Sequence, residues 1–262
     1  MRRFAVHFAL AASLIFGFAL VLHGSVLKVL IGSWQPAGNM SSARTNGTAA
    51  LVPDGRIVFA GGTATDGQPT ALVDAFSSNG TFSSLPGMSV ARSGHAAILT
   101  LSGDLLVTGG RTSGGGATNS AEVFDSLSNT WQILPAAMVE PRSGHTMSQL
   151  QDGNILIAGG ENSSGPIAAL EFYDLASDTF RFAGVLATAR KGHSAAALLD
   201  GRVLIVGGTM LQADGSTATL ASTELYDPAN GAVSAGPNLS TPRTGATATT
   251  LIDGRVLIAG GS

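Results

Sequence analysis

Residues 142–160 read RSGHTMSQLQDGNILIAGG, and the chain carries a version of this unit five times. In every copy an arginine is followed ten residues later by a turn position, and seven residues after that by a pair of glycines. The arginines are Arg44, Arg92, Arg142, Arg190 and Arg243. The glycine pairs are Gly61-Gly62, Gly109-Gly110, Gly159-Gly160, Gly207-Gly208 and Gly260-Gly261. A fixed period of about 50 residues is typical of a repeat architecture.

Each copy contains two apolar runs on either side of a tight turn. The turn reads Asp-Gly in four copies, at 54, 152, 200 and 253, and Ser-Gly at 102. Asp-Gly in this setting predicts a β-hairpin with a type I′ turn, in which both central residues have positive φ. Runs such as ILIA at 155–158 and VLIV at 203–206 are apolar throughout, as in strands buried on both faces. We therefore predict two buried strands, a and b.

Two further strands follow each glycine pair. Strand c reads EVFD at 122–125, EFYD at 171–174 and ELYD at 224–227, with a weaker DAFS at 74–77. After a second turn, an apolar residue opens strand d: Phe82, Trp131, Phe180 or Val233. One such unit cannot bury both its faces, but several units stacked around an axis can. The prediction is an all-β fold, a β-propeller of four-stranded antiparallel blades with four full repeats and partial blades at both ends.

The detailed motifs resemble kelch repeats, the superfamily that includes the central domain of galactose oxidase. The resemblance rests on RSGH at 92–95 and 142–145, RKGH at 190–193, the Tyr-Asp pairs and NTW at 129–131. It covers residues 34–262, with repeats near 44–91, 92–141, 142–189 and 190–242 and a partial repeat at 243–262. It implies a ring of six or seven blades, so we expect this chain, with Trp34 as a lone strand d, to be part of a longer propeller. Open edges would favour self-association.

The first 33 residues differ in character from the repeats. Arg2-Arg3 precede an apolar run from Phe4 to Leu22, and a second apolar stretch extends to Ile31. This pattern predicts a signal peptide or, if it is not cleaved, a signal anchor over residues 4–31. The arginines would stay in the cytoplasm. The repeats would then be extracytoplasmic, as in a bacterial-type exported protein, with membrane contact only through this segment.

Composition excludes several classes of function. The chain has no cysteine, so thiolate metal sites and thiol nucleophiles are excluded. All 17 acidic residues but only 11 of the 14 basic ones follow residue 33, which gives the repeats a net charge of −6. Because phosphate binding requires a basic surface, we do not expect a nucleic-acid partner.

The alternation of strands places the d–a and b–c connections at one end of the blades. The b–c loops vary in length, and variable loops on a rigid scaffold are typical binding elements. The longest, residues 209–222, carries Asp214 near its tip. The five repeated arginines lie at the same end, where their guanidinium groups could bind ligand carboxylates. Alternatively, they join one blade to the next by hydrogen-bonding carbonyl groups or the repeated acids Glu122, Glu171 and Glu224.

The repeated histidines and aromatic residues belong to the motif itself. His95, His145 and His193 open strand a, where a metal site is conceivable but a structural role fits better, because Gly47 and Ala246 replace them in the other copies. Trp131 is a structural residue of the motif, and Tyr173 and Tyr226 are predicted to pack between blades. We expect no metal and no cofactor.

The kelch resemblance brings two enzymatic comparisons. The copper-radical site of galactose oxidase needs a tyrosine cross-linked to cysteine, which this chain lacks. A cofactor-free sugar isomerase resembling N-acetylneuraminate epimerase stays open, with Glu140 and Glu161 as candidate bases because both depart from the repeat pattern. The favoured interpretation is a non-enzymatic module that binds a protein or a glycan. A purely architectural module of a longer surface protein is the remaining alternative.

Overall fold

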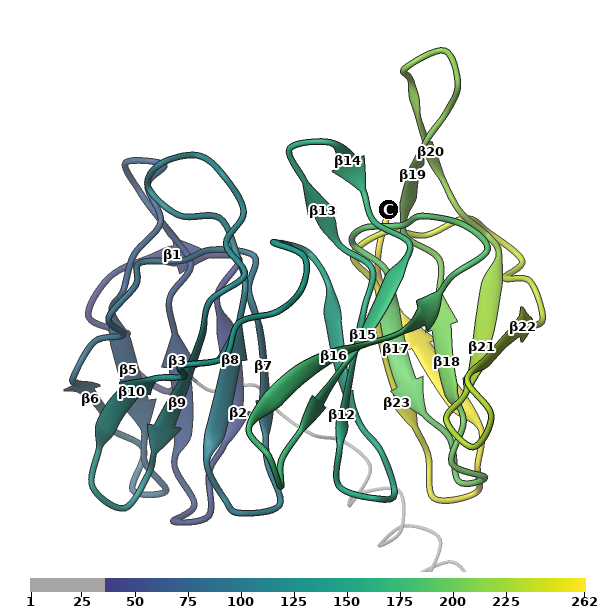
Figure 1. Cartoon of the computed structure of the whole chain (residues 1–262). Coiled ribbons are helices and arrows are strands. Elements are labelled where there is room, and N and C mark those ends of the chain that lie inside the picture. Colours follow the sequence, from purple (N-terminus) through teal and green to yellow (C-terminus); the bar gives the residue numbers. More distant parts are fainter. Residues whose placement is uncertain (1–35) are drawn as a thin grey trace, which may run out of the picture. The chain divides into compact units, whose positions relative to one another are not determined.

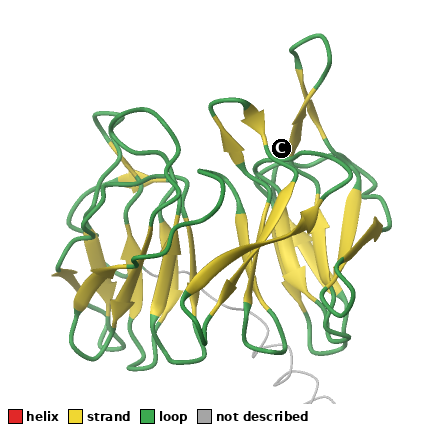
Figure 2. Ribbon diagram, in the orientation of Figure 1, coloured by secondary structure: helices red, strands yellow, loops and turns green. Residues whose placement is uncertain are grey.

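The computed structural model describes residues 36–262, and all regular elements in this range are β-strands (Figure 2). The predicted leader and Trp34 lie outside the described residues. Four four-stranded antiparallel sheets follow one another along the chain, each with its strands paired in chain order (Figure 1). These sheets are blades 1 to 4 of the predicted β-propeller. Within residues 36–262 the structure contains no helix that is long and apolar enough to cross a membrane.

Strands a to d of each blade have the following bounds. Blade 1 is β2 (Thr48–Leu51), β3 (Ile57–Ala60), β5 (Val73–Phe76) and β6 (Phe82–Leu85). Blade 2 is β7 (Ala96–Leu99), β8 (Leu105–Thr108), β9 (Ala121–Asp125) and β10 (Thr130–Ile133). Blade 3 is β11 (Thr146–Gln149), β12 (Ile155–Ala158), β15 (Ala169–Asp174) and β16 (Thr179–Val185). Blade 4 is β17 (Ser194–Ala197), β18 (Val203–Val206), β21 (Thr223–Asp227) and β22 (Ala232–Ala235).

The remaining strands form short two-stranded ribbons. After blade 4, β23 (Thr247–Thr250) pairs with β24 (Val256–Ala259) as strands a and b of a fifth copy. The others lie in the connections: β1 (Arg44–Thr45) with β4 (Thr63–Ala64), β13 (Glu161–Asn162) with β14 (Gly165–Pro166), and β19 (Thr209–Leu211) with β20 (Thr217–Thr219). In Figure 1 the hairpins β13–β14 and β19–β20 project from one end of the blades. We call this the loop end, because it carries the d–a and b–c connections, and the opposite end the turn end.

The a–b hairpins are present, but their turns are not of the predicted type I′. In the first copy only Gly55 has positive φ, at 88°, and Asp54 does not. Gly55 N donates to Val52 O at 2.9 Å, and Val52 N donates to Arg56 O at 2.9 Å. This pattern is that of a three-residue loop, a turn followed by a left-handed glycine that forms a bulge. The aspartate is instead selected for its side chain, since Asp54 Oδ1 accepts a hydrogen bond from Arg56 N at 3.0 Å.

The hydrophobic core lies between the blades rather than inside any one of them. Strands β8, β12 and β18 are buried at all four positions. The prediction that strand a is also buried was wrong, because β2, β7, β11 and β17 each have partly exposed positions. Three core clusters each combine residues of two adjacent blades, such as Leu156 and Phe172 of blade 3 with Ile205 and Tyr226 of blade 4. Each such side chain contributes about 1.5–3 kcal/mol when it leaves water. Stacking of the repeats therefore supplies the stability that a single repeat lacks.

The glycine pairs let consecutive blades approach closely. In blade 3, Gly159 and Gly160 have φ values of 56° and 99°, a region that side chains disfavour. The second glycine hydrogen-bonds to the next blade, because Gly160 N donates to Arg190 O at 2.9 Å. A Cβ atom on Gly159 would lie 2.6 Å from the same Arg190 O, and one on Gly160 would lie 2.8 Å from Ser143 O in the connection that enters its own blade. The pair is thus required both by conformation and by crowding of the two backbones.

Gly160→Ala is expected to destabilise the protein by about 2 kcal/mol or more, because the new methyl group meets a backbone carbonyl as well as an unfavourable φ. Gly115→Ala is the matched control. It also has positive φ, at 80°, but nothing lies within 4 Å of its Cβ position. It should cost only about 1 kcal/mol. Unfolding in urea would measure both losses, and equal losses would contradict the crowding argument.

Candidate functional site: the loop end

An arginine buried within each blade anchors the d–a connection. Arg142 Nη1 donates hydrogen bonds to Gly159 O at 2.8 Å and to Ala169 O at 3.0 Å, and its Nη2 forms an ion pair with Glu171. Glu171 also accepts hydrogen bonds from the backbone N–H groups of Val139 and Glu140, at 2.7 and 3.0 Å. The guanidinium group thereby ties strand b, strand c and the incoming connection together.

The same arrangement recurs along the chain. Arg92 pairs with Glu122 at 2.8 Å and Arg190 with Glu224 at 2.7 Å. In the first copy the shorter Asp74 takes the place of glutamate and pairs with Arg44 at 2.8 Å. In the last copy, the side chain of Arg243 has one hydrogen bond among the described residues, from Nη1 to Gly260 O at 2.7 Å.

These contacts correct the hypothesis of an open arginine ring. The side chains of Arg92, Arg142 and Arg190 are fully buried, and that of Arg44 is only 3% exposed. A ligand at the loop end therefore meets no guanidinium group from these four positions. Their periodicity reflects one structural contact repeated in each blade. The alternative interpretation is right about the partners, which are carbonyl groups and the repeated acids, but wrong about their place, because the side-chain contacts of Arg92 and Arg142 stay within one blade.

The repeated histidines join neighbouring blades. His95 Nε2 lies 2.9 Å from Thr48 Oγ1 of blade 1, His145 Nε2 lies 2.9 Å from Thr108 Oγ1 of blade 2, and His193 Nε2 lies 3.0 Å from Thr146 Oγ1 of blade 3. All three rings are buried. Burial, followed by the nearby repeat arginine, lowers the pKa of His95 to about 4 and that of His193 to about 3, and the pKa of His145 also lies well below 6.5. Among residues 36–262 no group of three histidine or acidic side chains is placed to hold a metal ion.

An ion cluster crosses the loop end. Glu161 Oε1 accepts a hydrogen bond from Arg111 Nη2 at 2.6 Å, and Glu161 Oε2 accepts one from Lys191 Nζ at 2.5 Å. The three residues belong to connections of blades 2, 3 and 4. Short backbone bridges fix each of them, such as Glu161 N to Ser143 O at 2.8 Å and Lys191 N to Thr209 O at 3.0 Å.

The cluster is open to solvent, unlike the repeated ion pairs. The side chains of Arg111, Lys191 and Glu161 are 49%, 34% and 18% exposed. Burial acts to raise the pKa of Glu161, but hydrogen bonds from Lys191 and Arg111 outweigh it and hold the pKa below its ordinary value. Glu161 is therefore a carboxylate held between two cations, and the cluster as a whole carries one positive charge that a ligand can reach.

Arg111 and Lys191 were not predicted as site residues. Glu161 was selected because it departs from the repeat pattern, and the same criterion applies to both of these residues. Arg111 directly follows a glycine pair where the other copies have threonine, glutamate or serine, and Lys191 follows a repeat arginine where they have threonine or serine. What the sequence does not show is that three connections from different blades bring these departures from the pattern together.

The family model described as KLHDC2/KLHL20/DRC7 Kelch-repeats domain matches residues 46–261. The chain belongs to the kelch-repeat family. No curated protein shows significant similarity to it. The kelch propeller is a fold that mediates protein interactions, and the stacked blades provide the scaffold for such a role.

The two tyrosines of the kelch motif pack between blades as predicted. Tyr173 and Tyr226 are buried in core clusters, with the Tyr226 ring 5.9 Å from that of Phe172 in the preceding blade. Trp131 lies 5.0 Å from Phe124, ring centre to ring centre, and its Nε1 donates to Pro86 O of the preceding connection at 2.9 Å. These side chains are structural.

The other two predicted acids do not join Glu161 in one site. Glu140 is half-buried, and its backbone N–H is bound to Glu171. Asp214 is exposed in the loop of the β19–β20 hairpin, where its Oδ1 accepts hydrogen bonds from Ser216 Oγ at 2.6 Å and from Ser216 N at 2.9 Å. The Ser216 hydroxyl, followed by its N–H, lowers the pKa of Asp214. No hydrogen bond links the three acids.

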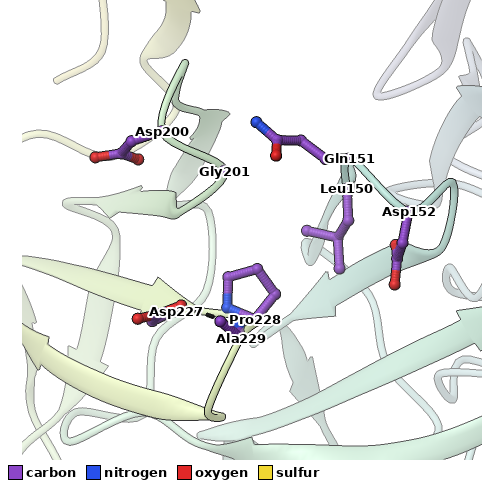
Figure 3. Close-up of a pocket in the computed structure, with 8 residues that line it drawn as sticks. All are labelled: Leu150, Gln151, Asp152, Asp200, Gly201, Asp227, Pro228 and Ala229. Atoms are coloured by element: carbon purple, nitrogen blue, oxygen red, sulfur yellow. Dashed lines mark hydrogen bonds between the residues drawn. The ribbon is translucent and has the colours of Figure 1, made fainter.

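A shallow hollow of about 240 Å³ lies at the turn end, between blades 3 and 4 (Figure 3). Three aspartates line it, but Figure 3 shows their carboxylates apart from one another. Each is bound within its own turn, Asp152 to Asn154, Asp200 to Arg202 and Asp227 to Asn230. Gln151 spans the hollow by donating to Leu199 O at 3.3 Å. The hollow is a gap between neighbouring turns whose polar groups are already paired, so the loop end is the better candidate for a binding site.

Proposed function

We propose that this kelch propeller is a non-enzymatic module that binds a protein partner at the loop end. The observation that carries this proposal is the exposed ion cluster of Arg111, Glu161 and Lys191, which lies among variable connections. Its net positive charge, on repeats with a net charge of −6, favours an acidic segment of the partner. Arginine suits such contacts because its planar fork binds carboxylates with two hydrogen bonds.

The hairpins β13–β14 and β19–β20 extend this surface. They lie side by side, because β14 and β19 are neighbours in space. Leu211 is 47% exposed, so it offers an apolar contact beside the charged cluster. A combination of apolar and charged contacts is typical of protein interfaces.

The low basicity of Glu161 argues against the sugar-isomerase alternative. A general base works best with a pKa near the working pH, whereas Arg111 and Lys191 lower the pKa of this carboxylate. A glycan that carries carboxylate groups is an alternative ligand for the same surface.

The first 33 residues lead us to place the propeller outside the cytoplasm. Paired arginines before a long apolar run are the supporting pattern. Fusing residues 1–33 to alkaline phosphatase, which is active only after export from the bacterial cytoplasm, tests this placement. An inactive fusion would contradict it.

Binding of a fluorescent glutamate-rich peptide tests the loop-end site. The double substitution Arg111→Ala/Lys191→Ala should weaken binding at least tenfold, which corresponds to about 1.4 kcal/mol. The matched control is Arg202→Ala/Arg255→Ala, which removes the same charge at the turn end. Equal weakening by both variants would show that only net charge matters and would contradict the proposal.

Two further arms distinguish the alternatives. Shortening the β19–β20 hairpin should also weaken binding of a protein ligand. N-acetylneuraminate followed by NMR should show no isomerisation above the uncatalysed rate. Turnover that Glu161→Gln abolishes in a folded protein would overturn the binding role in favour of an isomerase.

A further inference from the structure

Two exposed leucines lie at the turn end of blade 2. Leu101 belongs to the a–b turn and is 72% exposed, and Leu127 belongs to the c–d turn and is 87% exposed. Neighbouring strands of a sheet are about 4.8 Å apart, so the two turns of one blade lie about 10 Å from each other. The turns do not require leucine, because Gln151 and Ala176 hold the corresponding positions in blade 3. Exposed apolar side chains that the fold does not need are typical of a binding surface.

Contacts between neighbouring turns hold this apolar surface in place. Arg56 Nη2 of blade 1 donates to Ser126 O at 3.0 Å and to Asn129 Oδ1 at 2.8 Å, on either side of Leu127. On the side of blade 3, Leu101 lies beside Gly153, where a Cβ atom would be 2.9 Å from Leu101 Cδ1. A surface that is ordered in advance loses little conformational entropy when a partner binds.

The turn end also carries the whole net charge of the repeats. Nine aspartates and three arginines lie in its turns or at the adjoining end of strand c, which gives −6, and the other eight acidic and eight basic residues after residue 33 balance. None of the nine aspartates is buried. They are Asp54, Asp104, Asp125, Asp152, Asp174, Asp178, Asp200, Asp227 and Asp253.

Five of these aspartates belong to blades 2 and 3, whose turns contain no basic residue. None of the five forms an ion pair among the described residues, whereas Asp54, Asp200 and Asp253 each pair with an arginine of their own turn. Their hydrogen bonds come from neutral groups, as in Asp125, which accepts one from Ser128 Oγ at 2.8 Å. Such bonds satisfy the carboxylate oxygens but leave the negative charge uncompensated.

We propose that the turn end of blades 2 and 3 is a docking surface for a basic segment of a partner polypeptide. Apolar side chains of the segment cover Leu101 and Leu127, and its lysine or arginine side chains face Asp104 and Asp125. Charge complementarity selects this occupant, because the uncompensated aspartates attract a cationic chain and repel both an anionic membrane and the turn end of a second copy. The surface is at the opposite end from the ion cluster, so it does not depend on the function proposed above.

A fluorescent peptide with the sequence KLGKLKKLGKLK serves as the probe, and its anisotropy on addition of the folded chain should show saturable binding. Leu101→Ser/Leu127→Ser should weaken binding at least tenfold. Asp104→Asn/Asp125→Asn should do the same, because asparagine keeps the side-chain acceptor of each turn but removes the charge. A peptide with serine in place of leucine should also bind at least tenfold more weakly.

The matched controls lie at the loop end. Asp66→Asn/Asp214→Asn removes the same charge from two exposed turns in which the carboxylate likewise accepts a backbone N–H two residues on, and Leu211→Ser removes an exposed leucine. Each should leave binding within about twofold.

Absence of saturable binding at 1 mM peptide would overturn the proposal. Equal weakening by the two pairs of aspartate substitutions would also overturn it, because only net charge would then matter, and so would equal affinity for the serine peptide. Binding to vesicles of anionic phospholipid that Leu101→Ser/Leu127→Ser abolishes would identify a membrane-contact surface instead and contradict a polypeptide partner.

Discussion

Acidification from pH 6.5 to 5 is expected to destabilise the protein by up to about 4 kcal/mol per pH unit, because three buried histidines stay neutral when folded. In the unfolded chain they take up protons near pH 6.5, whereas the folded pKa values of His95 and His193 are about 4 and 3. The unfolded state therefore binds more protons in this window, and stability falls as the pH falls. Each histidine contributes about 1.4 kcal/mol per pH unit.

Urea unfolding at pH 7.5, 6.5, 5.5 and 5.0 would measure this slope. Carboxylates with lowered pKa values, such as Asp54 and Asp200, lose their contribution only below about pH 4, so they do not disturb this window. His193→Asn provides the control and should reduce the slope by about a third while lowering stability at neutral pH. A stability that is flat between pH 7.5 and 5 would mean that the histidines are not buried between blades.

Arg142→Met is expected to destabilise the protein by about 3–5 kcal/mol, because it leaves Glu171 charged and buried without its ion-pair partner. It also removes the donor to Gly159 O and Ala169 O. The matched control is Arg202→Met, where the partner Asp200 is half-exposed, and we expect a change within about 0.5 kcal/mol.

Arg142→Lys gives a second, milder test of the same contact. Lysine retains the charge but lacks the planar fork that reaches Gly159, Ala169 and Glu171 together. The stability of the lysine variant should therefore lie between that of the methionine variant and that of the wild type. Chemical unfolding would rank the three variants. A methionine variant no less stable than Arg202→Met would show that the buried pair does not anchor the d–a connection.

Most of the fold could be predicted because the repeat exposes the same local signals five times. As predicted, the apolar runs form strands, the glycine pairs follow strand b, and the Tyr-Asp motifs end strand c. The prediction of a type I′ turn was wrong because an Asp-Gly pair fits both a two-residue hairpin loop and a three-residue loop with a bulge. Hydrogen bonds of Val52 with Gly55 and Arg56 decide between them, and the sequence does not contain that information.

The candidate site was less predictable, because periodicity does not reveal the direction of a side chain. Arg92 and Arg142 recur at the loop end as a binding ring would, yet they point into their blades to reach Glu122 and Glu171. Arg111 and Glu161 lie 50 residues apart and meet only through blade stacking. Departures from the repeat, rather than its repeated positions, mark the surface that a partner can reach.

The measurement that tests blade stacking most directly is an NMR titration of the histidine ring protons in the folded protein between pH 8 and 5. Single substitutions to asparagine assign the signals of His95, His145 and His193. Stacked blades predict that these three signals keep the chemical shifts of neutral imidazole down to pH 5, as long as the protein is folded. A titration midpoint near 6.5 for any of them would place that ring in water and contradict the interface between its two blades.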